Sequence, residues 1–380
     1  MKIISKKTDF WKKAAKGALV LLVLISLIFY KDSFREIWEG IRRVKAGELL
    51  VCLLLAGTGY LLEGMTIFRM MGAVVPSPSL WEGVFIAYVC EFYRLTTMGN
   101  GSGVAEIHYL CKSEMRKKKG SPIAEAKGGQ EWPQGEKIAP GSATVLTMIQ
   151  YIMKRIAIMG LGLLSFLILC QKENTRELCR EYGVFVSAGC VISAGVIGIF
   201  LALSLWERVA AVAIHVLEWL SGKIPAKEGV FQKWREQIIL LNRSGKAILG
   251  QKKRMLCAVL IQMGKLLLFY GIIAYLLKGA TEMGAGMCIL LMALAFMLSG
   301  VIPAPSGAGA LEFVFLLFFS RFVNTGAAVT AMLVYRFATW IFPAAVGGVF
   351  LAADRRRSGK GTGKMPQSKT PQQADGASNL

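Results

Sequence analysis

Hydrophobic residues along the chain are gathered into long blocks that are separated by shorter polar stretches. Most blocks are about as long as a helix needs to cross the hydrocarbon core of a bilayer, and none shows the alternation of membrane barrel strands. The pattern therefore predicts an all-α, polytopic membrane protein, a helical bundle of about six full spans plus two re-entrant helical hairpins. The blocks cover residues 18–30, 49–62, 145–170, 184–205, 255–277, 285–302 and 326–353.

Two segments rich in glycine or proline interrupt apolar stretches. Residues 96–103 read TTMGNGSG, and residues 302–309 read IPAPSGAG. Each predicts a break between two half-helices. We expect the first pair of half-helices to enter the membrane from the cytoplasmic face and the second from the opposite face. Such a pair of breaks, one in each half of the chain, is typical of transporters built from inverted repeats, although no residue-level repeat is visible.

Composition and charge agree with a membrane setting. The chain is 54% hydrophobic with a mean hydropathy of +0.50, which is too apolar for a soluble globular protein of this length. Its formal net charge is +21, yet no nucleic-acid recognition motif accompanies the basic residues, so we expect no nucleic-acid binding. Lys and Arg instead lie between the apolar blocks. Six fall in residues 1–16, seven in 112–140, ten in 206–254 and six from 355 onward.

Because basic loops stay on the inner side of a membrane, these segments are predicted to be cytoplasmic, together with both termini. The predicted localisation is the cytoplasmic membrane. The apolar block after the basic N-terminus has no small-residue cleavage site, which favours an uncleaved first span. Residues 206–254 are expected to form interfacial or cytoplasmic helices. The predicted organisation is a cytoplasmic N-terminus (1–13), one transmembrane domain (14–353) with polar cytoplasmic loops (112–142 and 206–254), and a disordered tail (354–380).

The sequence offers little that points to metal or hydrolytic chemistry. Its eight cysteines are scattered without a C-x-x-C pair, and its two histidines lie in separate segments. No zinc-protease, serine-hydrolase or nucleotide-binding motif is present. We therefore expect no cofactor, no metal site and no autonomous enzyme, although an acid–base site made of Glu and Tyr stays open.

Ionisable residues inside apolar segments are costly and are therefore functional candidates. Arg94, Glu106 and Tyr109 flank the first break, and the half-helix that begins near Gly103 would point its free N–H groups at an anion such as a lipid phosphate. The alternative is a structural bend. Lys265 lies deep in an apolar block and stays a candidate without a motif.

Three further ionisable residues are functional candidates for the same reason. Arg155 follows Lys154 near the start of a span and either reaches back to the interface or binds a ligand. Arg336 lies in the middle of a span, where an arginine must pair with an acid, a carbonyl or a bound anion. Glu312 stands in the first turn after the second break. We predict that Glu312 and Arg336 form a pair, either as a scaffold or as a substrate site.

At these residues the sequence resembles a known family, the lysylphosphatidylglycerol synthase transmembrane-region family. Phe92–Gly103, followed by Ile107–Leu110, resembles its segment N-x-x-T-P-x-x-x-G-G…Y-Y-L. Ile302–Glu312 resembles its second signature, P-x-P-G-G-x-G-x-x-E, and Val334–Phe337 its closing L-Y-R span. The resemblance covers roughly residues 10–355. It departs from the pattern at Met98, Gly101–Gly103 and Ser306.

The family includes the membrane half of the multiple peptide resistance factor, which translocates aminoacylated phosphatidylglycerol between leaflets. The resemblance thus implies a flippase-like protein whose partner is a membrane phospholipid, anionic or aminoacylated. No counterpart of that protein's cytosolic lysine-transferring domain is expected here. Two alternatives stay open: a phosphatidylglycerol lysyltransferase or lipid-linked transferase, alone or as the membrane subunit of a separate synthase, and a non-transporting membrane scaffold. The residues matched to the family's motifs are Gly103, Tyr109, Gly307, Gly309, Glu312 and Arg336.

Overall fold

The computed structural model describes residues 42, 44–74, 78–97, 99, 101–112, 138, 140–223, 228–280, 283–302 and 309–361. The predicted first span at 18–30, the N-terminus before it and the tail after 361 lie outside these residues. Within them the chain forms 12 α-helices and one π-helical turn, and the predicted all-α class is confirmed. The helices are α3 Ala46–Met71, α4 Leu80–Thr96, α5 Ser102–Cys111, α6 Pro140–Cys170, α7 Glu173–Leu205, α8 Glu207–Lys223, α9 Glu228–Leu249, α10 Lys252–Leu276, α11 Ala285–Ser299, α12 Ala310–Phe319, α13 Thr325–Arg336 and α14 Phe342–Gly361, with the π-turn η4 at Phe337–Ile341.

Five of the described helical segments are long and apolar enough to cross a membrane. They are α3, most of α6, most of α7, α10 and the continuous run from α13 into α14. Two shorter helices, α11 and α12, are also apolar. The chain is therefore a multi-pass membrane protein.

The predicted break after the first half-helix is confirmed, because α4 ends at Thr96 and α5 begins at Ser102. The second is confirmed likewise, between Ser299 and Ala310.

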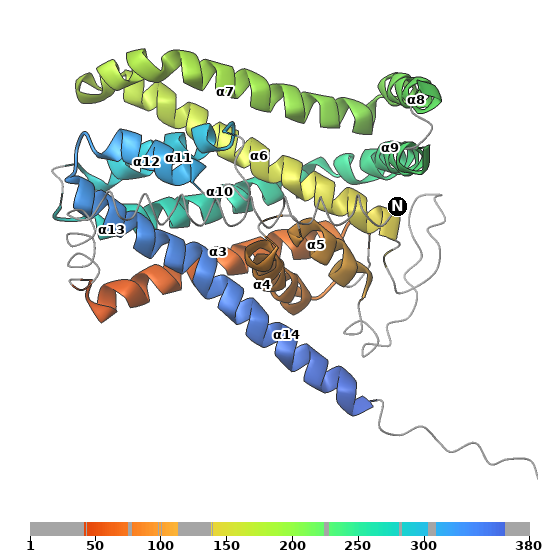
Figure 1. Ribbon diagram of the computed structural model, residues 1–380, viewed down its shortest axis with the longest axis horizontal. Coiled ribbons are helices and arrows are strands. Elements are labelled where there is room, and N and C mark those ends of the chain that lie inside the picture. The colour runs from red at the N-terminus through yellow and green to blue at the C-terminus, as the bar shows by residue number, and fades with distance from the viewer. Residues whose placement is uncertain are drawn as a thin grey trace, which may run out of the picture.

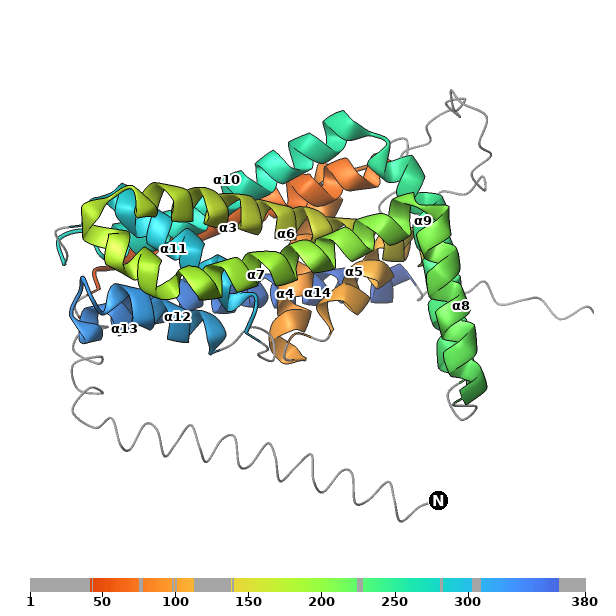
Figure 2. The same ribbon diagram turned by 90° about the horizontal axis from the view of Figure 1, so that it is seen from above.

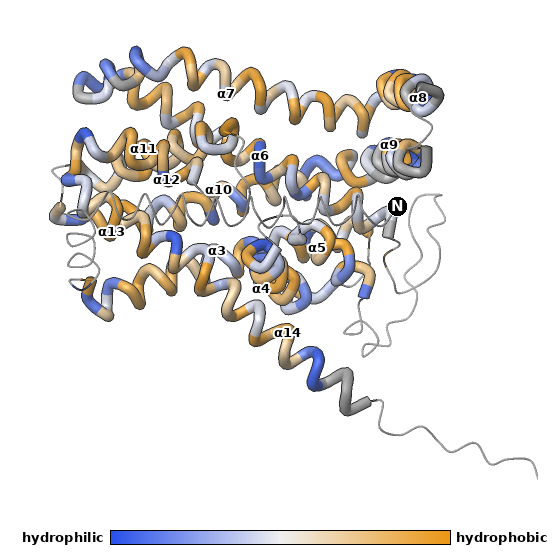
Figure 3. Tube along the Cα trace, in the orientation of Figure 1, coloured by the Kyte–Doolittle hydropathy of each residue, from blue (hydrophilic) through white to orange (hydrophobic). Residues whose placement is uncertain are grey.

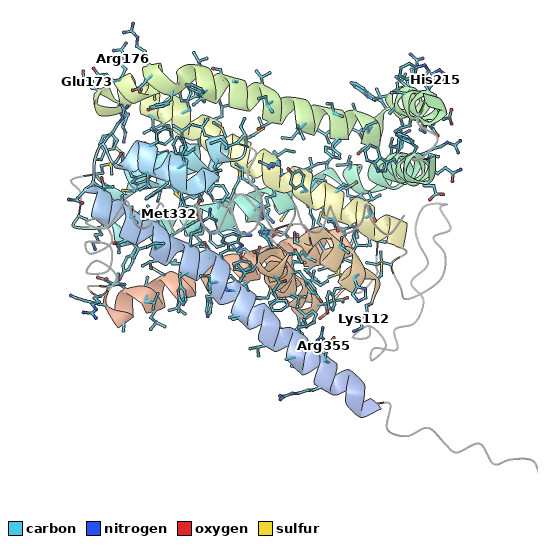
Figure 4. The ribbon with its side chains drawn as sticks, viewed as in Figure 1. Lys112, Glu173, Arg176, His215, Met332 and Arg355 are labelled. Atoms are coloured by element: carbon cyan, nitrogen blue, oxygen red, sulfur yellow. The ribbon has the colours of Figure 1, made fainter. Side chains whose placement is uncertain are left out.

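The long helices run side by side, so that the bundle has two distinct ends (Figure 1). We call one of them the basic end. It holds the end of α5, the start of α6 and the connections on either side of the α8–α9 pair, and Figure 4 places Lys112, His215 and Arg355 there. Glu173 and Arg176 lie at the opposite end. In Figure 3 hydrophilic segments gather at both ends and hydrophobic ones cover most of the length between them.

The two interrupted helix pairs lie in different halves of the bundle. α11 and α12 pack against each other at the opposite end, whereas α4 and α5 lie nearer the basic end (Figures 1 and 2). α8 and α9 cross the basic end at a steep angle to α6 and α7, since Figure 1 shows them end-on. Their crosswise placement accords with helices that lie along a membrane surface, which stays a prediction.

Glycines let α4 approach its two neighbours closely. A Cβ added at Gly83 would lie 2.2 Å from the carbonyl oxygen of Gly64 on α3. One added at Gly347 on α14 would lie 2.1 Å from the carbonyl oxygen of Tyr88 on α4. Small residues at such crossings allow backbones to pack directly, as is usual between helices in membranes. α4 is thereby held between α3 and α14, and its polar residues are fixed within the bundle.

Candidate functional site

Six ionisable side chains from five helices meet inside the bundle, and we call them the central charged cluster. Three are acids and three are bases, and electrostatic interactions join them into one group. Because an isolated charge is costly inside an apolar bundle, such groups persist by compensating one another. The members are Glu63 on α3, Glu91 and Arg94 on α4, Glu106 on α5, Lys154 on α6 and Lys265 on α10.

The most deeply buried pair of the cluster joins α10 to α3. Lys265 Nζ donates to Glu63 Oε2 at 2.8 Å, and Gln262 Nε2 donates to the same oxygen at 2.8 Å. The Lys265 side chain is only 4% exposed. Its ammonium also lies 5.1 Å from the ring centre of Tyr60 and 5.2 Å from that of Phe269, which is cation–π range. The Lys265 ammonium is thus compensated by one carboxylate and two aromatic rings.

A second ion pair lies within α4 and is more open. Arg94 Nη1 is 2.6 Å from Glu91 Oε1, one helical turn away. The Arg94 side chain is 33% exposed and that of Glu91 is 5% exposed. A guanidinium held on one side by a carboxylate and open on the other can still offer N–H donors to an incoming anion.

Several buried polar atoms near these pairs have no hydrogen-bond partner. They are Oε2 of Glu91, Oε1 of Glu106, Nε2 of Gln150 and Oε1 of Gln262. Thr147, Gln150 and Lys154 recur every three or four residues, so they share one face of α6, and α5, which carries Glu106, packs against α6. Buried polar atoms are nearly always satisfied in folded proteins. This group therefore has donor and acceptor capacity left for a polar ligand.

The predicted pair of Arg336 and Glu312 is confirmed, and its geometry is bidentate. Arg336 Nε donates to Glu312 Oε1 at 2.6 Å and Nη2 donates to Oε2 at 2.9 Å. The Gly309 N–H also donates to Glu312 Oε2 at 2.8 Å, which caps the start of α12. Gly309 has φ +87°, a conformation that favours glycine. The Glu312 carboxylate therefore both caps the helix that follows the second break and binds Arg336.

A π-helical turn, η4, begins directly after Arg336. Its hydrogen bond runs from the N–H of Phe342 to the carbonyl of Phe337, five residues back. π-turns within α-helices occur frequently at functional sites. Here the turn carries Trp340, whose ring centre lies 5.0 Å from the Arg336 guanidinium carbon. It also carries Thr339, whose carbonyl accepts the Tyr60 hydroxyl at 2.8 Å.

The remaining predicted site residues occupy other positions. Arg155 donates from Nε to Tyr151 Oη at 2.9 Å, and its Nη1 lies 3.5 Å from the carbonyl oxygen of Gly300, at the end of α11. Its neighbour Lys154 is the one that joins the central charged cluster.

The glycines and the tyrosine of the two matched motifs lie in different structural surroundings. Gly103 lies in the first turn of α5 with open space around its Cα, and Gly101 is the N-cap. Tyr109 packs edge-on against Phe85, with Lys112 over its ring, toward the basic end. Gly307 lies outside the described residues. Whether any of these residues acts in function stays a prediction.

Some features of the site were not predicted from the sequence. Tyr60 and the π-turn had no motif or charge to mark them. Within the described residues, no group of three or more His, Cys, Asp and Glu could hold a metal ion.

Comparison with protein families agrees with the motifs. The family model described as the lysylphosphatidylglycerol synthase TM region matches residues 14–347. The chain belongs to this family. The matched residues contain the whole central charged cluster and the Arg336–Glu312 pair. No curated protein matches the chain.

Proposed function

We propose that this chain is a flippase-like membrane protein that binds an anionic or aminoacylated phospholipid, of the lysyl-phosphatidylglycerol type, and translocates it between leaflets. The observation that carries the proposal is the central charged cluster, three acids and three bases from five helices inside an apolar bundle. A scaffold needs no such group, because buried ion pairs add little net stability over apolar packing. Family membership supports the same conclusion.

The chemistry of the cluster suits a headgroup that carries both signs of charge. A lipid phosphate would accept N–H groups from Arg94, whose fork matches two phosphate oxygens. An ammonium group would be held by carboxylates, of which Glu91 and Glu106 each have an unpartnered oxygen. The headgroup would thus exchange water for fixed polar groups while its acyl chains stay in lipid.

The proposed orientation places the basic end in the cytoplasm, because α8 and α9, in the segment 206–254 that holds ten Lys and Arg, lie there (Figure 1). The pairs α4–α5 and α11–α12 then enter the membrane as re-entrant hairpins from opposite faces. Alternate exposure of the cluster to the two sides would move the headgroup. The opposed placement of the two helix pairs in Figure 1 supports this arrangement.

The test is reconstitution of the pure protein into liposomes that carry labelled lysyl-phosphatidylglycerol, phosphatidylglycerol or phosphatidylethanolamine in one leaflet. We expect the first or second lipid to reach the other leaflet faster than in protein-free liposomes. Arg94→Gln should abolish the effect, because the donors for phosphate are lost. Arg235→Gln is the matched control, because it removes one member of an exposed surface pair with Glu218 at 3.2 Å. Equal rates in protein-free and protein-containing liposomes would contradict the proposal.

A second candidate is aminoacyl transfer, which the family's description as a synthase region favours. The same liposomes supplied with lysyl-tRNA distinguish it from translocation. We expect no new lysyl-lipid to form. In a host without aminoacylated lipids, the chain should leave total lysyl-lipid at zero and alter its leaflet distribution only when a separate synthase is supplied. Synthesis by this chain alone would replace the transport proposal with the transferase.

A further inference from the structure

Tyr60 lies between the central charged cluster and the Arg336–Glu312 pair. It stands in the middle of α3 and is only 3% exposed. Its ring stacks on that of Tyr88 on α4, with centres 5.2 Å apart, and lies 5.8 Å from Phe269 on α10. The ring is therefore packed between α4 and α10.

On one side, Tyr60 contacts the deepest ion pair of the cluster. Its ring centre lies 5.1 Å from Lys265 Nζ, the same ammonium that binds Glu63 at 2.8 Å. Glu63 follows Tyr60 on α3 by nearly one turn. Any ligand that draws Lys265 or Glu63 out of their pair would change the cation–π contact with Tyr60.

On the other side, the hydroxyl of Tyr60 reaches the turn that shapes the second charged pair. It donates to the carbonyl of Thr339 at 2.8 Å, across 279 residues of sequence. Thr339 lies three residues after Arg336 and directly before Trp340, which covers the arginine. One side chain thus contacts both the Lys265 ammonium and the turn that follows Arg336.

We propose that Tyr60 is a positioning residue that couples the two charged centres. A change in the Lys265–Glu63 pair moves the Tyr60 ring, its hydroxyl pulls on or releases the Thr339 carbonyl, and the π-turn changes the position of Arg336 against Glu312. The π-turn is a suitable switching element, because loss of its extra residue would rotate α13, which ends at Arg336, relative to α14, which follows the turn. Coupling of this kind requires an element with two arrangements that both sites influence. The inference rests on the proposed function only for what the coupling would serve. The coupling itself can be measured whether or not the protein moves lipid.

The coupling can be measured without lipid transport. A cysteine is introduced at Phe313, which is 62% exposed and follows Glu312 on α12, in a full-length background without other cysteines, and its labelling rate is followed in liposomes. Lys265→Gln perturbs the central pair. With Tyr60 present, we expect Lys265→Gln to change the labelling rate by about threefold or more. Combined with Tyr60→Phe, which keeps the ring and removes the hydroxyl, the same change should have little effect.

Two further variants make the test decisive. Tyr88→Phe is the matched control, because Tyr88 stacks on Tyr60, and it should leave the response to Lys265→Gln intact. Glu63→Gln perturbs the central pair from its other side and should change the labelling rate in the same direction as Lys265→Gln. An equal response in the Tyr60 and Tyr60→Phe backgrounds would overturn the proposal, as would an unchanged rate in Glu63→Gln. If the coupling is present but the protein moves no lipid, the proposed function fails and the coupling stands.

Discussion

The ammonium of Lys265 lies 2.8 Å from Glu63 Oε2, so a buried ion pair joins the two helices α10 and α3. The two helices pack along much of their length. Gln262 donates to the Glu63 carboxylate, and the rings of Tyr60 and Phe269 face the Lys265 ammonium. A charge buried this deeply contributes to stability only while its partner is present.

Removal of one partner of this pair should destabilise the protein. We expect Lys265→Met to cost about 3–5 kcal/mol, because Glu63 is left without its charged partner in the bundle. The double variant with Glu63→Gln should recover most of that loss and still fail to translocate lipid. Thermal unfolding in detergent measures the stability. Lys246→Met is the control, since its pair with Glu207 is exposed and should contribute little to stability. A single variant as stable as the parent would contradict the prediction.

Substitutions at Arg336 distinguish a lipid-binding role of this residue from a scaffolding role. We expect Arg336→Gln to keep expression and detergent stability close to the parent, because Glu312 is 32% exposed and still accepts the Gly309 N–H. The same change should abolish translocation, because the second charged centre loses its guanidinium. Arg336→Lys should be partly active, since a point charge replaces the bidentate fork. Yield, thermal stability and lipid translocation are measured together. A collapse of stability that a charge-exchanged Arg336 and Glu312 pair repairs would show a scaffold instead.

The orientation of the bundle can be tested with two introduced cysteines on a background without the native ones. Ser121→Cys falls in the basic segment 113–137 and should resist impermeant thiol reagents in intact cells, because that segment is expected in the cytoplasm. Lys172→Cys, in the turn between α6 and α7 at the opposite end, is exposed and should be labelled readily. The reverse labelling pattern would invert the proposed topology.

Two glycines provide a matched test of helix packing. Gly83→Ala should destabilise the protein by about 1–3 kcal/mol or more, because its Cβ would lie 2.2 Å from the Gly64 carbonyl oxygen and push α4 away from α3. Gly103→Ala should be tolerated in stability, since nothing lies within 4 Å of the added Cβ. Thermal unfolding of both variants decides this. If Gly103→Ala is stable but inactive in translocation, Gly103 has the functional role that the family motif implies.

The sequence alone determined the class of the protein, its main breaks and one of its ion pairs. Apolar blocks, Gly- and Pro-rich interruptions and family motifs are local properties of the chain, so they can be seen without knowing which helices meet. Arg336 and Glu312 were paired correctly because an arginine in the middle of a span needs a partner, and Glu312, beside the second break, is the nearest acid of that kind in sequence. The helix ends were less predictable. The block at 49–62 ends before Glu63, whereas α3 continues to Met71, since the charge of Glu63 is compensated inside the bundle.

Only the tertiary structure decided which charges meet. Residues next to each other on a helix point in directions about 100° apart, so the rotation of α6 places Lys154 in the central charged cluster and Arg155 beside Gly300. Local sequence does not contain that rotation, because it is set by how α6 packs against α5, α10 and α11. The role of Tyr60 also depends on how the helices pack. Its hydroxyl meets the Thr339 carbonyl only because α3 packs against a π-turn far away in the sequence.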